Sequence, residues 1–578
     1  MRIIINNIKM PIRHTTEDVI KTARDIVRSD CISADNFEIY RQSLDARRKN
    51  NIHYVYSVSA STAEDTVLAK GIRRAEVTES LKPKKAYLSS RPVVVGLGPC
   101  GLFAAWVLTL SGNPPLIIER GEDAESRRVT VKNFWKSGIL NTNSNVQFGE
   151  GGAGAFSDGK LTTRISDPRQ RFVLKTLVEF GAPKDILYKA KPHIGTDLLC
   201  GVITAMRRRM QELGAEVRFN TRLTDIKVSG GRVEGIVIND DEEILCKNLI
   251  LAIGHSSRDT YERLLSLGAA AEPKPFAMGV RIEHSQEFID NLQYGAKTDK
   301  TDLPPADYRV TYNEKDRSCY SFCMCPGGVV VNASSEKNRL AVNGMSYHSR
   351  SGENANSALV VPVRPTDFIG TDGGIRLQQK YEELAFLLGG GEGAAPIQLA
   401  EDFVKDCPTE RLKRVEPTVT SGFKIAEIKN CLPKFVVETL RRGLCDFEHR
   451  MPGFSGGGAV LTGIESRTSA PIRFIRGKNL ESINIGGLYP SGEGAGYAGG
   501  IVSAAVDGIK SASMLIENNI IDVPSMHGSI SINSVTGLYM LNNTIKADKM
   551  LNESTQPVVI SNSSIKMIDG LNFDYKQN

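Results

Sequence analysis

Three glycines and one glutamate form the pattern with the clearest chemistry in this sequence. Gly96, Gly98 and Gly101 follow an apolar run of three valines with the spacing G-x-G-x-x-G. This spacing allows a tight turn, close approach of the backbone to a pyrophosphate, and close packing of the next helix on the strand. Glu119 stands 18 residues after Gly101, where a carboxylate can accept hydrogen bonds from both ribose hydroxyls and repel a 2′-phosphate. The pattern predicts a dinucleotide site.

A second glycine-rich stretch, residues 147–164, contains Gly151 and Gly152. Glycines in such a loop let backbone amides approach an anion or the electron-rich edge of a bound ring system. A flexible surface loop is the alternative, but long loops are uncommon in compact domains unless they are functional. We therefore expect this loop to contact the same ligand as the first motif.

Three histidines are low-ranking candidates for proton transfer, and the catalytic residues stay unassigned. His255 directly follows Gly254 at the end of an apolar strand, so we expect its imidazole near the ligand. His284 and His348 lie in the region where we expect substrate to bind. For each histidine a structural role is the alternative.

Three arginines could clamp a substrate carboxylate or phosphate through paired hydrogen bonds. They are Arg281, Arg350 and Arg467. For each of them a structural or solvated ion pair is the more ordinary role.

Cys319, Cys323 and Cys325 form one cluster, in CYSFCMCPGG. The spacing C-x₃-C-x-C is not that of a zinc or iron–sulfur site, and we predict no metal. Strand alternation would place Cys323 and Cys325 on one face, which suits a disulfide poorly. A redox role and a buried strand that enters a turn are the two interpretations.

The elements around these motifs divide the chain into five parts. Residues 1–82 predict a small, basic α/β domain. Residues 91–262 alternate strands with helices, residues 263–452 mix strands with glycine- and proline-rich turns, and residues 453–516 resemble the first block again. We expect a Rossmann-like α/β domain interrupted by an inserted α+β substrate domain. Residues 517–578 predict an appended tail that can be disordered.

Two later segments resemble the flavin domain of the glutathione-reductase superfamily. Residues 211–240 are similar to the strand that passes the adenine and the hairpin that follows it. The resemblance implies a backbone contact to the adenine near Leu223. The apolar strand that ends at Gly254 is similar to the one that returns the chain beneath the flavin.

A third segment, residues 481–512, resembles the closing FAD motif of that superfamily. There an acidic residue after a glycine bonds the ribityl hydroxyls, and a helix N-terminus faces the flavin or the pyrophosphate. Glu493 takes the acidic position after Gly492, where aspartate is commoner in the superfamily, and the helix begins near Gly500 and Ile501.

Taken together, the chain resembles the bacterial FAD-dependent dehydrogenases, a family whose members are mostly uncharacterised. The resemblance reaches to about residue 515 and is carried by GEGGAGAFSDGKL, KPHIGTDLL, AIGHSSRDTY, FAMGVRIEH, YSFCMCPGGVVV and GEGAGYAGGIVSAA. It implies one bound FAD and an oxidoreductase that transfers hydride between the flavin and a small molecule. The cofactor-binding residues that we predict are Gly96, Gly98, Pro99, Gly101, Glu119, Arg120, Gly151, Gly152, Leu223, Gly254, Gly492, Glu493, Gly500 and Ile501.

The source of electrons stays open. No second G-x-G-x-x-G pattern occurs between residues 265 and 450, so we expect no dedicated nicotinamide domain. NAD(P)H can still bind transiently over the flavin, or electrons can come from the substrate or from a partner protein.

The composition and the N-terminal sequence indicate where the protein is located. No apolar run is long enough to span a membrane, and the N-terminus lacks the pattern of a signal peptide. Ten cysteines in such a chain indicate reduced thiols and a cytoplasmic protein.

The net charge is +6, and residues 1–90 hold sixteen Lys and Arg against eleven Asp and Glu. This charge is too mild to indicate nucleic acid by itself. It leaves open a flavoprotein of RNA modification that uses the basic N-terminal domain. A non-catalytic FAD-binding or assembly protein is the third hypothesis.

Overall fold

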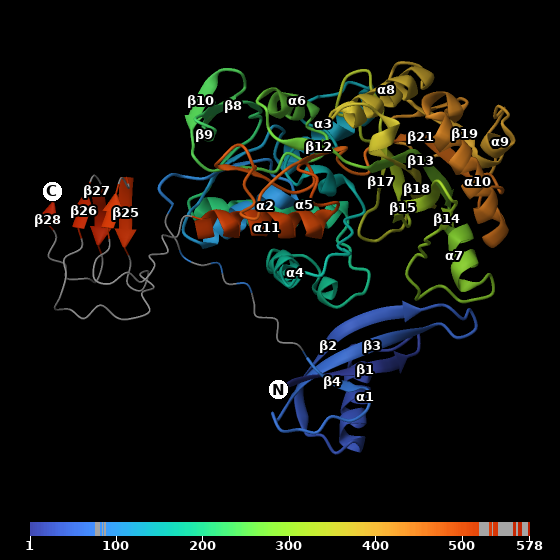
Figure 1. Cartoon of the computed structure of the whole chain (residues 1–578). Helices are drawn as coiled ribbons and strands as arrows, with labels where there is room; N and C mark the ends of the chain where they lie inside the picture. Colours follow the sequence, from blue (N-terminus) through green and yellow to red (C-terminus); the bar gives the residue numbers. More distant parts are fainter. Residues whose placement is uncertain are drawn as a thin grey trace.

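The computed structural model shows an N-terminal domain, a central α/β region and an inserted region with a large sheet (Figure 1). Within the chain of 578 residues, the structure describes residues 1–75, 81, 83, 85, 88–518 and five short strands after residue 530. These strands are β24 Ser531–Asn533, β25 Thr536–Met540, β26 Val559–Ser561, β27 Ser564–Ile568 and β28 Lys576–Gln577. The prediction of a disordered tail over 517–578 lies mostly outside the described residues. Helix α11 extends to Asn518.

The N-terminal domain is a four-stranded antiparallel sheet with one helix against it. Its elements are β1 Arg2–Met10, α1 Thr16–Ser29, β2 Ala34–Asp45, β3 His53–Thr62 and β4 Ile72–Arg74, in the sheet order β2-β3-β1-β4. Thr15 and Asp18 form a capping box that starts α1. The buried face of this helix consists of Val19, Ala23 and Val27, at the spacing of successive turns.

The central region contains a five-stranded parallel sheet in the order β23-β11-β5-β6-β7. Its strands are β5 Val93–Val95, β6 Leu116–Ile118, β7 Glu216–Arg218, β11 Leu249–Leu251 and β23 Leu488–Pro490. β23 follows β11 by more than 200 residues in the chain, yet the two strands pair. The chain therefore leaves this sheet and returns to it, and its mixed α/β character is confirmed.

Alternating side chains of the parallel sheet bury two different cores. Val94 and Ile117 point to one face, which α2 Pro99–Leu110, α4 Arg169–Glu179, α5 Thr196–Glu212 and α11 Ile501–Asn518 cover. Val93 and Ile118 point to the other face, which packs on a three-stranded sheet and α6. Those elements are β8 Leu223–Ser229, β9 Arg232–Ile238, β10 Glu242–Leu245 and α6 Arg258–Ser266. Helices α2, α5 and α11 lie in one layer in Figure 1.

The inserted region is organised around a seven-stranded mixed sheet in the order β14-β15-β18-β13-β21-β19-β20. The strands are β13 Phe276–Ser285, β14 Thr311–Asn313, β15 Ser318–Cys325, β18 Asn354–Val363, β19 Ala395–Leu399, β20 Phe423–Ile425 and β21 Val460–Glu465. Its helices are α7 Gln286–Tyr294, α8 Gly373–Leu388, α9 Ala400–Lys405 and α10 Lys434–Arg450. A separate hairpin consists of β16 Val329–Asn332 and β17 Val342–Met345.

The remaining elements are one helix, four 3₁₀ helices and a pair of short strands. They are α3 Ala124–Ser137, the 3₁₀ helices η1 Gly152–Phe156, η2 Lys184–Leu187, η3 Pro365–Asp367 and η4 Ile428–Cys431, and the strand pair β12 Ala271–Pro273 with β22 Ile472–Phe474. None of the helices in the described part of the chain has the length and apolarity to cross a membrane.

The strand pairing differs from the predicted sequence boundary in one place. Residues 453–516 are predicted to return to the Rossmann-like domain. β21 lies within them but pairs with β13 and β19 in the inserted sheet. β12 and β22 pair where the chain leaves and re-enters the central region. Both faces of β21 are buried, so its apolar sequence does not distinguish an inserted strand from a returning one.

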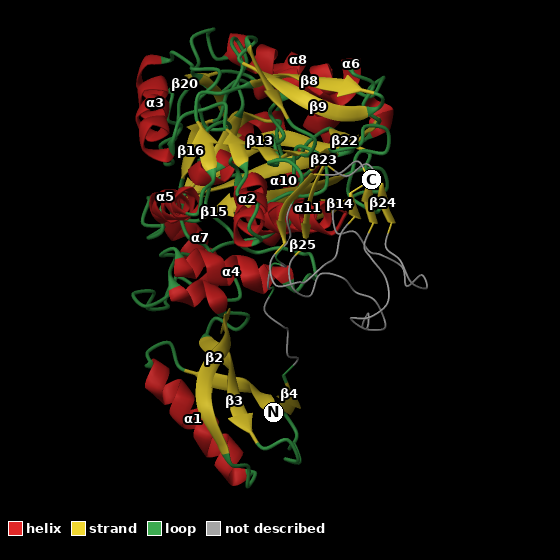
Figure 2. Ribbon diagram, turned by 90° about the vertical axis from the view of Figure 1, so that its left-hand side faces the viewer, coloured by secondary structure: helices red, strands yellow, loops and turns green. Residues whose placement is uncertain are grey.

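The N-terminal domain contacts the rest of the chain through its long hairpin. Gln42 of β2 exchanges backbone hydrogen bonds with Tyr188 and Ala190, which follow η2. Arg13 donates to Asp302 of the inserted region over 2.6 Å. Figure 2 shows this domain beyond α4, on the side away from the parallel sheet.

Candidate cofactor site and active site

The first glycine motif forms a strand–turn–helix corner, as predicted. Gly96 ends β5 with φ at +95°, and a Cβ there would collide with the carbonyl oxygen of Ala252 beside β11. Gly101 lies in the first turn of α2, where a Cβ would collide with the Gly96 carbonyl. Pro99 is the first residue of α2, a position that suits its missing N–H. The N-terminus of α2 therefore lies directly beyond the turn.

The second glycine-rich loop packs against this corner. Gly151 donates its N–H to the carbonyl of Leu97 over 2.8 Å. A Cβ on Gly152 would lie 3.1 Å from the Cα of Gly98, so the two backbones pass with no room for side chains. A Cβ on Gly154 would lie 3.2 Å from Ile501, at the start of α11. The loop thus lies against the N-termini of α2 and α11.

A fully buried arginine from α3 holds this loop in place. The Arg127 guanidinium donates to five carbonyl oxygens over 2.7 to 3.2 Å; these belong to Asn145, Val146, Gly149, Glu150 and Gly152. Burial lowers the pKa of Arg127 to about 10, while nearby acidic groups, Glu119 first, raise it. Sequence reasoning missed Arg127. A signal existed, because Val131 and Phe134 stand four and seven residues later on the same buried helix face.

Glu119 follows β6 and is buried beside the first turn. Its Oε2 accepts the N–H of Leu97 at 2.8 Å, and its Oε1 accepts the N–H groups of Gly121 and Gly149 at 3.0 and 2.9 Å. A carboxylate offers about four acceptor positions, so about one is left. The sequence predicts hydrogen bonds from both ribose hydroxyls; the geometry leaves room for one unless a backbone N–H gives way.

Arg120 lies next to the glycine-rich loop with its charge already paired. Its guanidinium donates to Asp259 of α6 over 3.1 and 2.6 Å and lies 4.2 Å from the ring centre of Phe148. Leu223 lies in β8 and pairs with Ile238 in the adjoining strand. The residues before it run past the end of β6, because Thr221 donates its N–H to the Glu119 carbonyl over 2.9 Å.

The closing segment meets the turn after β11. A Cβ on Gly494 would lie 2.6 Å from the carbonyl oxygen of Gly254. Gly492 donates its N–H over 2.7 Å to Asp507 of α11, and Asp507 is paired with Arg476 at 2.6 Å. This buried pair fixes the turn that carries Glu493. Four turns from distant parts of the chain therefore meet: those at Gly96–Gly101, Gly149–Gly154, Gly254 and Gly492–Gly494. Gly500–Ile501, where α11 begins, lies beside them.

His255 and Glu493 lie next to each other in this turn region. Nδ1 of His255 is 3.9 Å from Oε1 of Glu493, and its buried Nε2 has no hydrogen-bond partner among the described residues. Burial lowers the pKa of His255 to about 3, and the positive charges of Arg467 and Arg258 act in the same direction. Burial raises the pKa of Glu493 to about 7, although Lys274 opposes it. The site pairs a neutral imidazole with a carboxyl group that titrates near neutral pH.

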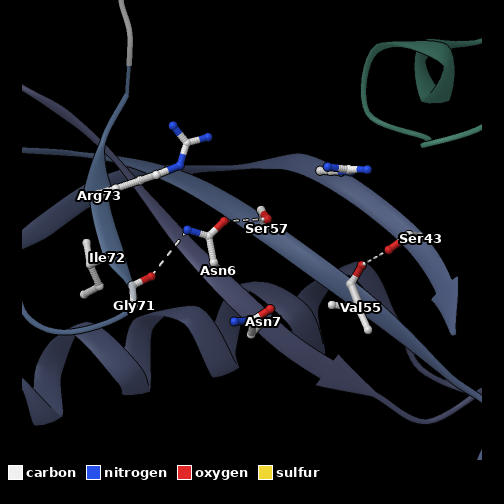
Figure 3. A pocket seen from close by; sticks show the side chains of 9 residues that line it. Asn6, Asn7, Ser43, Val55, Ser57, Gly71, Ile72 and Arg73 are labelled. Atoms are coloured by element: carbon white, nitrogen blue, oxygen red, sulfur yellow. Dashed lines mark hydrogen bonds between the residues drawn. The ribbon is translucent and has the colours of Figure 1, made fainter. Parts of the chain in front are cut away.

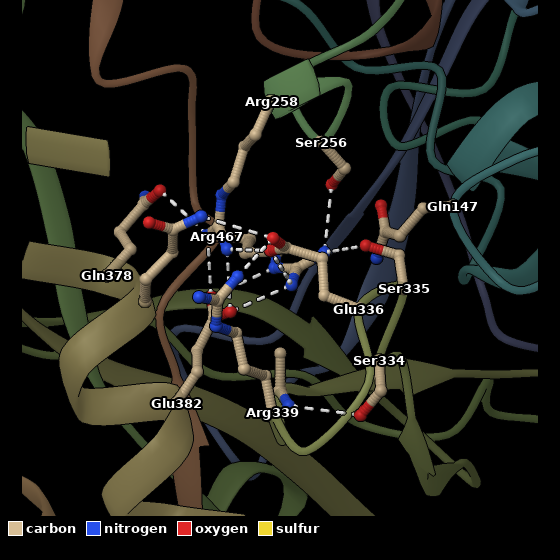
Figure 4. A network of polar contacts seen from close by, with 12 residues as sticks. Gln147, Ser256, Arg258, Ser334, Ser335, Glu336, Arg339, Gln378, Glu382 and Arg467 are labelled. Carbon is tan, nitrogen blue, oxygen red and sulfur yellow. Dashed lines mark hydrogen bonds and ion pairs between the residues drawn. The ribbon is translucent and has the colours of Figure 1, made fainter. Parts of the chain in front are cut away.

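A buried ionic network ties this turn to the inserted region (Figure 4). Glu382 of α8 accepts two hydrogen bonds from Arg258 of α6, over 2.9 and 2.8 Å, and two from Arg467, over 2.9 and 2.8 Å. Arg467 also donates to Ser256 over 3.2 Å, and Glu336 from the β16–β17 hairpin pairs with Arg258. The Glu382 carboxylate thus joins α8 to α6 and to the segment of Arg467, and the Glu336 carboxylate adds the hairpin through Arg258.

The two arginines keep the Glu382 carboxylate ionised in this network. Burial alone would raise the pKa of Glu382, but Arg258 and Arg467 lower it well below its ordinary value. Sequence reasoning missed Glu382, although Gln378 and Glu382 stand on the buried face of α8 with Ile375 and Ala385. Polar residues at such positions signal a buried network.

The other two predicted histidines do not lie in this turn region. His284 is buried in the inserted sheet, where its Nε2 bonds the Phe454 carbonyl at 2.7 Å and its ring stacks on Phe288. Burial lowers its pKa to about 4. Nδ1 of His348 donates to the Ile194 carbonyl over 2.8 Å, and the His348 ring stacks on His193. These contacts suit structural roles.

The three predicted arginine clamps all have partners within the chain. Arg281 is fully buried in β13 and donates to the Cys323 carbonyl over 2.8 Å, with Glu465 at 3.4 Å. Arg350 pairs with Asp158, and Arg467 pairs with Glu382. The structural ion pairs considered as the alternative are what the geometry contains.

The cysteine cluster differs from the alternation expected of a strand. A register shift between Phe322 and Cys325 interrupts the pairing of β15 with β18, and Cys323 has φ at +43°. Cys325 is buried while Cys323 is exposed, so the two do not share one face as predicted. All three thiols of the cluster are free, and burial raises the pKa of Cys319 and of Cys325.

One pocket of about 650 Å³ lies on the N-terminal domain instead (Figure 3). It is lined by Asn6, Asn7, Arg41, Ser43, Val55, Ser57, Gly71, Ile72 and Arg73. None of the predicted cofactor residues is among them. In the described ranges, no group of three or more His, Cys, Asp or Glu side chains is placed to hold a metal ion.

Family comparison defines the class of protein. Residues 275–468 match the family described as FAD-dependent protein, C-terminal domain-like, and residues 2–61 match a domain of unknown function, DUF8436. An uncharacterized protein of Clostridium beijerinckii is 50% identical over 531 residues, which cover 89% of this chain and 99% of that protein. The chain belongs to the same family as the C. beijerinckii protein.

More distant proteins share parts of the chain. Thiamine thiazole synthase of Aeropyrum pernix is 31% identical over 173 residues, which cover 29% of this chain and 52% of that enzyme. The match therefore spans about half of that enzyme's length. A glycine oxidase from Bacillus cereus is similar in structure with a TM-score of 0.29 and 12% identity, covering 74% of this chain and 95% of that one.

Proposed function

We propose that this protein binds one FAD where the glycine turns meet and acts as an oxidoreductase on a small molecule. The observation that supports this most is the backbone contact of distant turns, Gly98 with Gly152 and Gly254 with Gly494. Such contacts leave backbone N–H groups and helix N-termini free of side-chain cover, which suits a dinucleotide. The family membership agrees with this ligand.

The residues present fit the parts of FAD in a consistent order. The corner of Gly96 to Gly101 with Pro99 suits the pyrophosphate, and the last acceptor position of Glu119 suits one ribose hydroxyl. The strand near Leu223 suits the adenine. Glu493 is the acidic residue for the ribityl hydroxyls, and the Gly500–Ile501 helix start faces the same region. This order corresponds to the glutathione-reductase type of flavin domain.

We place the chemistry at the turn that carries His255. The FAD, when bound, supplies the capacity to accept or donate hydride. His255 is neutral at physiological pH, so its unbonded Nε2 can accept a hydrogen bond from substrate, or donate one in the other tautomer. Arg467 and Arg258 keep it neutral. The Glu382 network holds this turn against the inserted region, which we propose contacts the substrate.

The electron donor and the location complete the proposal. NAD(P)H is the proposed transient donor, with a partner protein as the alternative, and we propose a cytoplasmic enzyme. The RNA hypothesis rests on the basic N-terminal domain alone.

An absorbance spectrum of the purified protein, followed by anaerobic mixing with NADH and NADPH, tests the proposal. We expect flavin bands and bleaching by one of the two donors. A colourless protein that takes up no added FAD would contradict it. A flavin that only dithionite reduces would favour the non-catalytic hypothesis.

A further inference from the structure

Three distant segments meet at the C-terminal part of the glycine-rich loop, after its glycines at positions 149–154. They are residues 157–160, 193–197 and 346–350. A Cβ on Gly159 would lie 2.7 Å from the backbone nitrogen of Gly195, and a Cβ on Gly195 would collide with the backbone of His348. Thr196 also donates to the Ser157 carbonyl over 2.7 Å. The chain is thus packed tightly around a small group of charged side chains.

Lys160 is the member of this group whose charge is least compensated. Arg350 donates two hydrogen bonds to Asp158, which leaves that carboxylate only a 3.8 Å contact with the Lys160 ammonium. Among the described residues, the single hydrogen bond of Lys160 goes to the Met324 carbonyl. An ammonium has three donors, so two remain, and the side chain is 31% exposed.

The strand beside Lys160 presents aromatic rings. Tyr320 and Phe322 of β15 are partly exposed and pack against Ala277, Ala358 and Val360, which are small or short side chains of β13 and β18. The strand continues from Phe322 to Met324, whose carbonyl Lys160 contacts. A cation therefore stands at the end of an apolar, ring-bearing surface.

A second basic residue belongs to the same segment as Lys160. Arg164 is exposed and follows Lys160 by four residues. Burial raises the pKa of Tyr320, and the charge of Arg164 lowers it. Arg164 therefore adds a second positive charge to the segment that carries Lys160.

We propose that Lys160 binds the carboxylate of the substrate while Phe322 and Tyr320 contact its apolar body. The inference rests on the proposed function and specifies its substrate class: a carboxylic acid with an aromatic or bulky apolar group. A singly charged carboxylate fits because two donors of one ammonium can serve its two oxygens. The nearby N-terminus of α5 already carries Asp197, so it offers little to a doubly charged phosphate.

Benzoate and its neutral analogue benzamide test the proposal on the FAD-loaded protein. Titrations followed by flavin absorbance and by calorimetry should give benzoate at least tenfold tighter binding than benzamide. Lys160→Met should remove that difference, and Lys160→Arg should retain most of it. Phe322→Ala should weaken both ligands, because the ring contacts the apolar body that they share.

Lys191→Met is the matched control, since Lys191 is exposed and paired with Asp307 over 2.7 Å. It should bind benzoate like the parent protein. Benzoate binding that survives Lys160→Met, or a parent protein that binds neither ligand, overturns the inference.

Calorimetry separates this failure from that of the proposed function. A yellow protein without Lys160-dependent binding overturns the inference alone. A colourless protein that still binds benzoate through Lys160 overturns the FAD proposal and supports the carboxylate site.

Discussion

The two sides of the candidate site are held together by different parts of the chain. On the cofactor side, turns touch through backbone atoms, as Gly98 does with Gly152. On the side of the inserted region, charged side chains make the contacts, with Glu382 between Arg258 and Arg467. Backbone contacts require only glycine at the right spacing. A side-chain network requires complementary charges from several distant segments, and each one depends on the others.

The largest expected effect comes from blocking a backbone contact. In Gly101→Ala, the new methyl group would collide with the Gly96 carbonyl, so α2 must shift from β5. We expect loss of most bound FAD and a fall of more than about 4 kcal/mol in the free energy of unfolding. The ratio of flavin to protein absorbance and urea denaturation measure the two effects.

Gly201→Ala is the control for this substitution. Gly201 lies in α5 with open space around it, so alanine should be neutral or stabilise the helix by about 0.5–1 kcal/mol. If Gly101→Ala keeps its flavin and stability, the backbone contact is not the requirement proposed here.

A substitution of Arg127 tests the side-chain support of the same loop. Arg127→Met would leave five carbonyl groups of the loop without their donor. We expect a loss of about 4 kcal/mol in unfolding free energy and weaker FAD retention. Arg128→Met, at the exposed neighbouring position, should change neither. Equal behaviour of the two variants would contradict the supporting role of Arg127.

Glu382→Gln tests the ionic network on the side of the inserted region. The substitution keeps the size of the side chain but removes the charge between two buried guanidinium groups. We expect a loss of about 3 kcal/mol in unfolding free energy, because unpaired buried charge is costly. Glu383→Gln, on the exposed face of α8, should stay within about 0.5 kcal/mol of the parent. A network that tolerates the change would show that Arg258 and Arg467 are held by other contacts.

Glu493 gives a smaller, pH-dependent effect in the FAD-free protein. Its folded pKa of about 7 exceeds the ordinary 4.5, so the folded state binds the proton more tightly than the unfolded state. Stability from this group is full below pH 4.5 and is lost as the pH rises towards and through 7.

Glu493→Gln should therefore be roughly 1–3 kcal/mol more stable than the parent at pH 8 and no more stable at pH 4. Urea midpoints at both pH values measure this difference. Glu234→Gln, on the exposed side of β9, should show no such dependence. A parallel shift at both pH values would contradict the raised pKa.

The smallest effect is expected from the N-terminal pocket. Arg41→Gln with Arg73→Gln should leave flavin content and reduction by NAD(P)H unchanged, and stability within about 0.5 kcal/mol. RNA binding at low salt that these substitutions abolish would instead revive the RNA hypothesis.

The same contrast explains what the sequence predicts and what it does not. The corner at Gly96 and Gly101 could be predicted because spacing along a short segment determines it. The contacts of Gly98 with Gly152 and of Gly254 with Gly494 bring distant segments together, and the spacing within one segment does not determine them. The role of Arg127 was missed because its guanidinium hydrogen-bonds main-chain carbonyls. Every residue has such a carbonyl, so these partners give no pattern of residue types.

Tertiary pairing likewise decides what local patterns leave open. The apolar β21 could belong to either sheet, and pairing with β13 assigns it to the inserted one. His284 and Arg281 have residue types that suit catalysis, but the aromatic and ionic contacts around them are formed by β15, β21 and Phe454, far along the chain.

The pairing of β23 beside β11 has a consequence for how the protein is made. A growing chain on the ribosome has β5, β6 and α2 within its first 120 residues, but it lacks β23 and α11 until nearly 520 have been added. The nucleotide pocket can therefore close only near the end of translation. Until then the apolar surface of α2 that α11 covers is exposed, which makes the unfinished chain a substrate for chaperones.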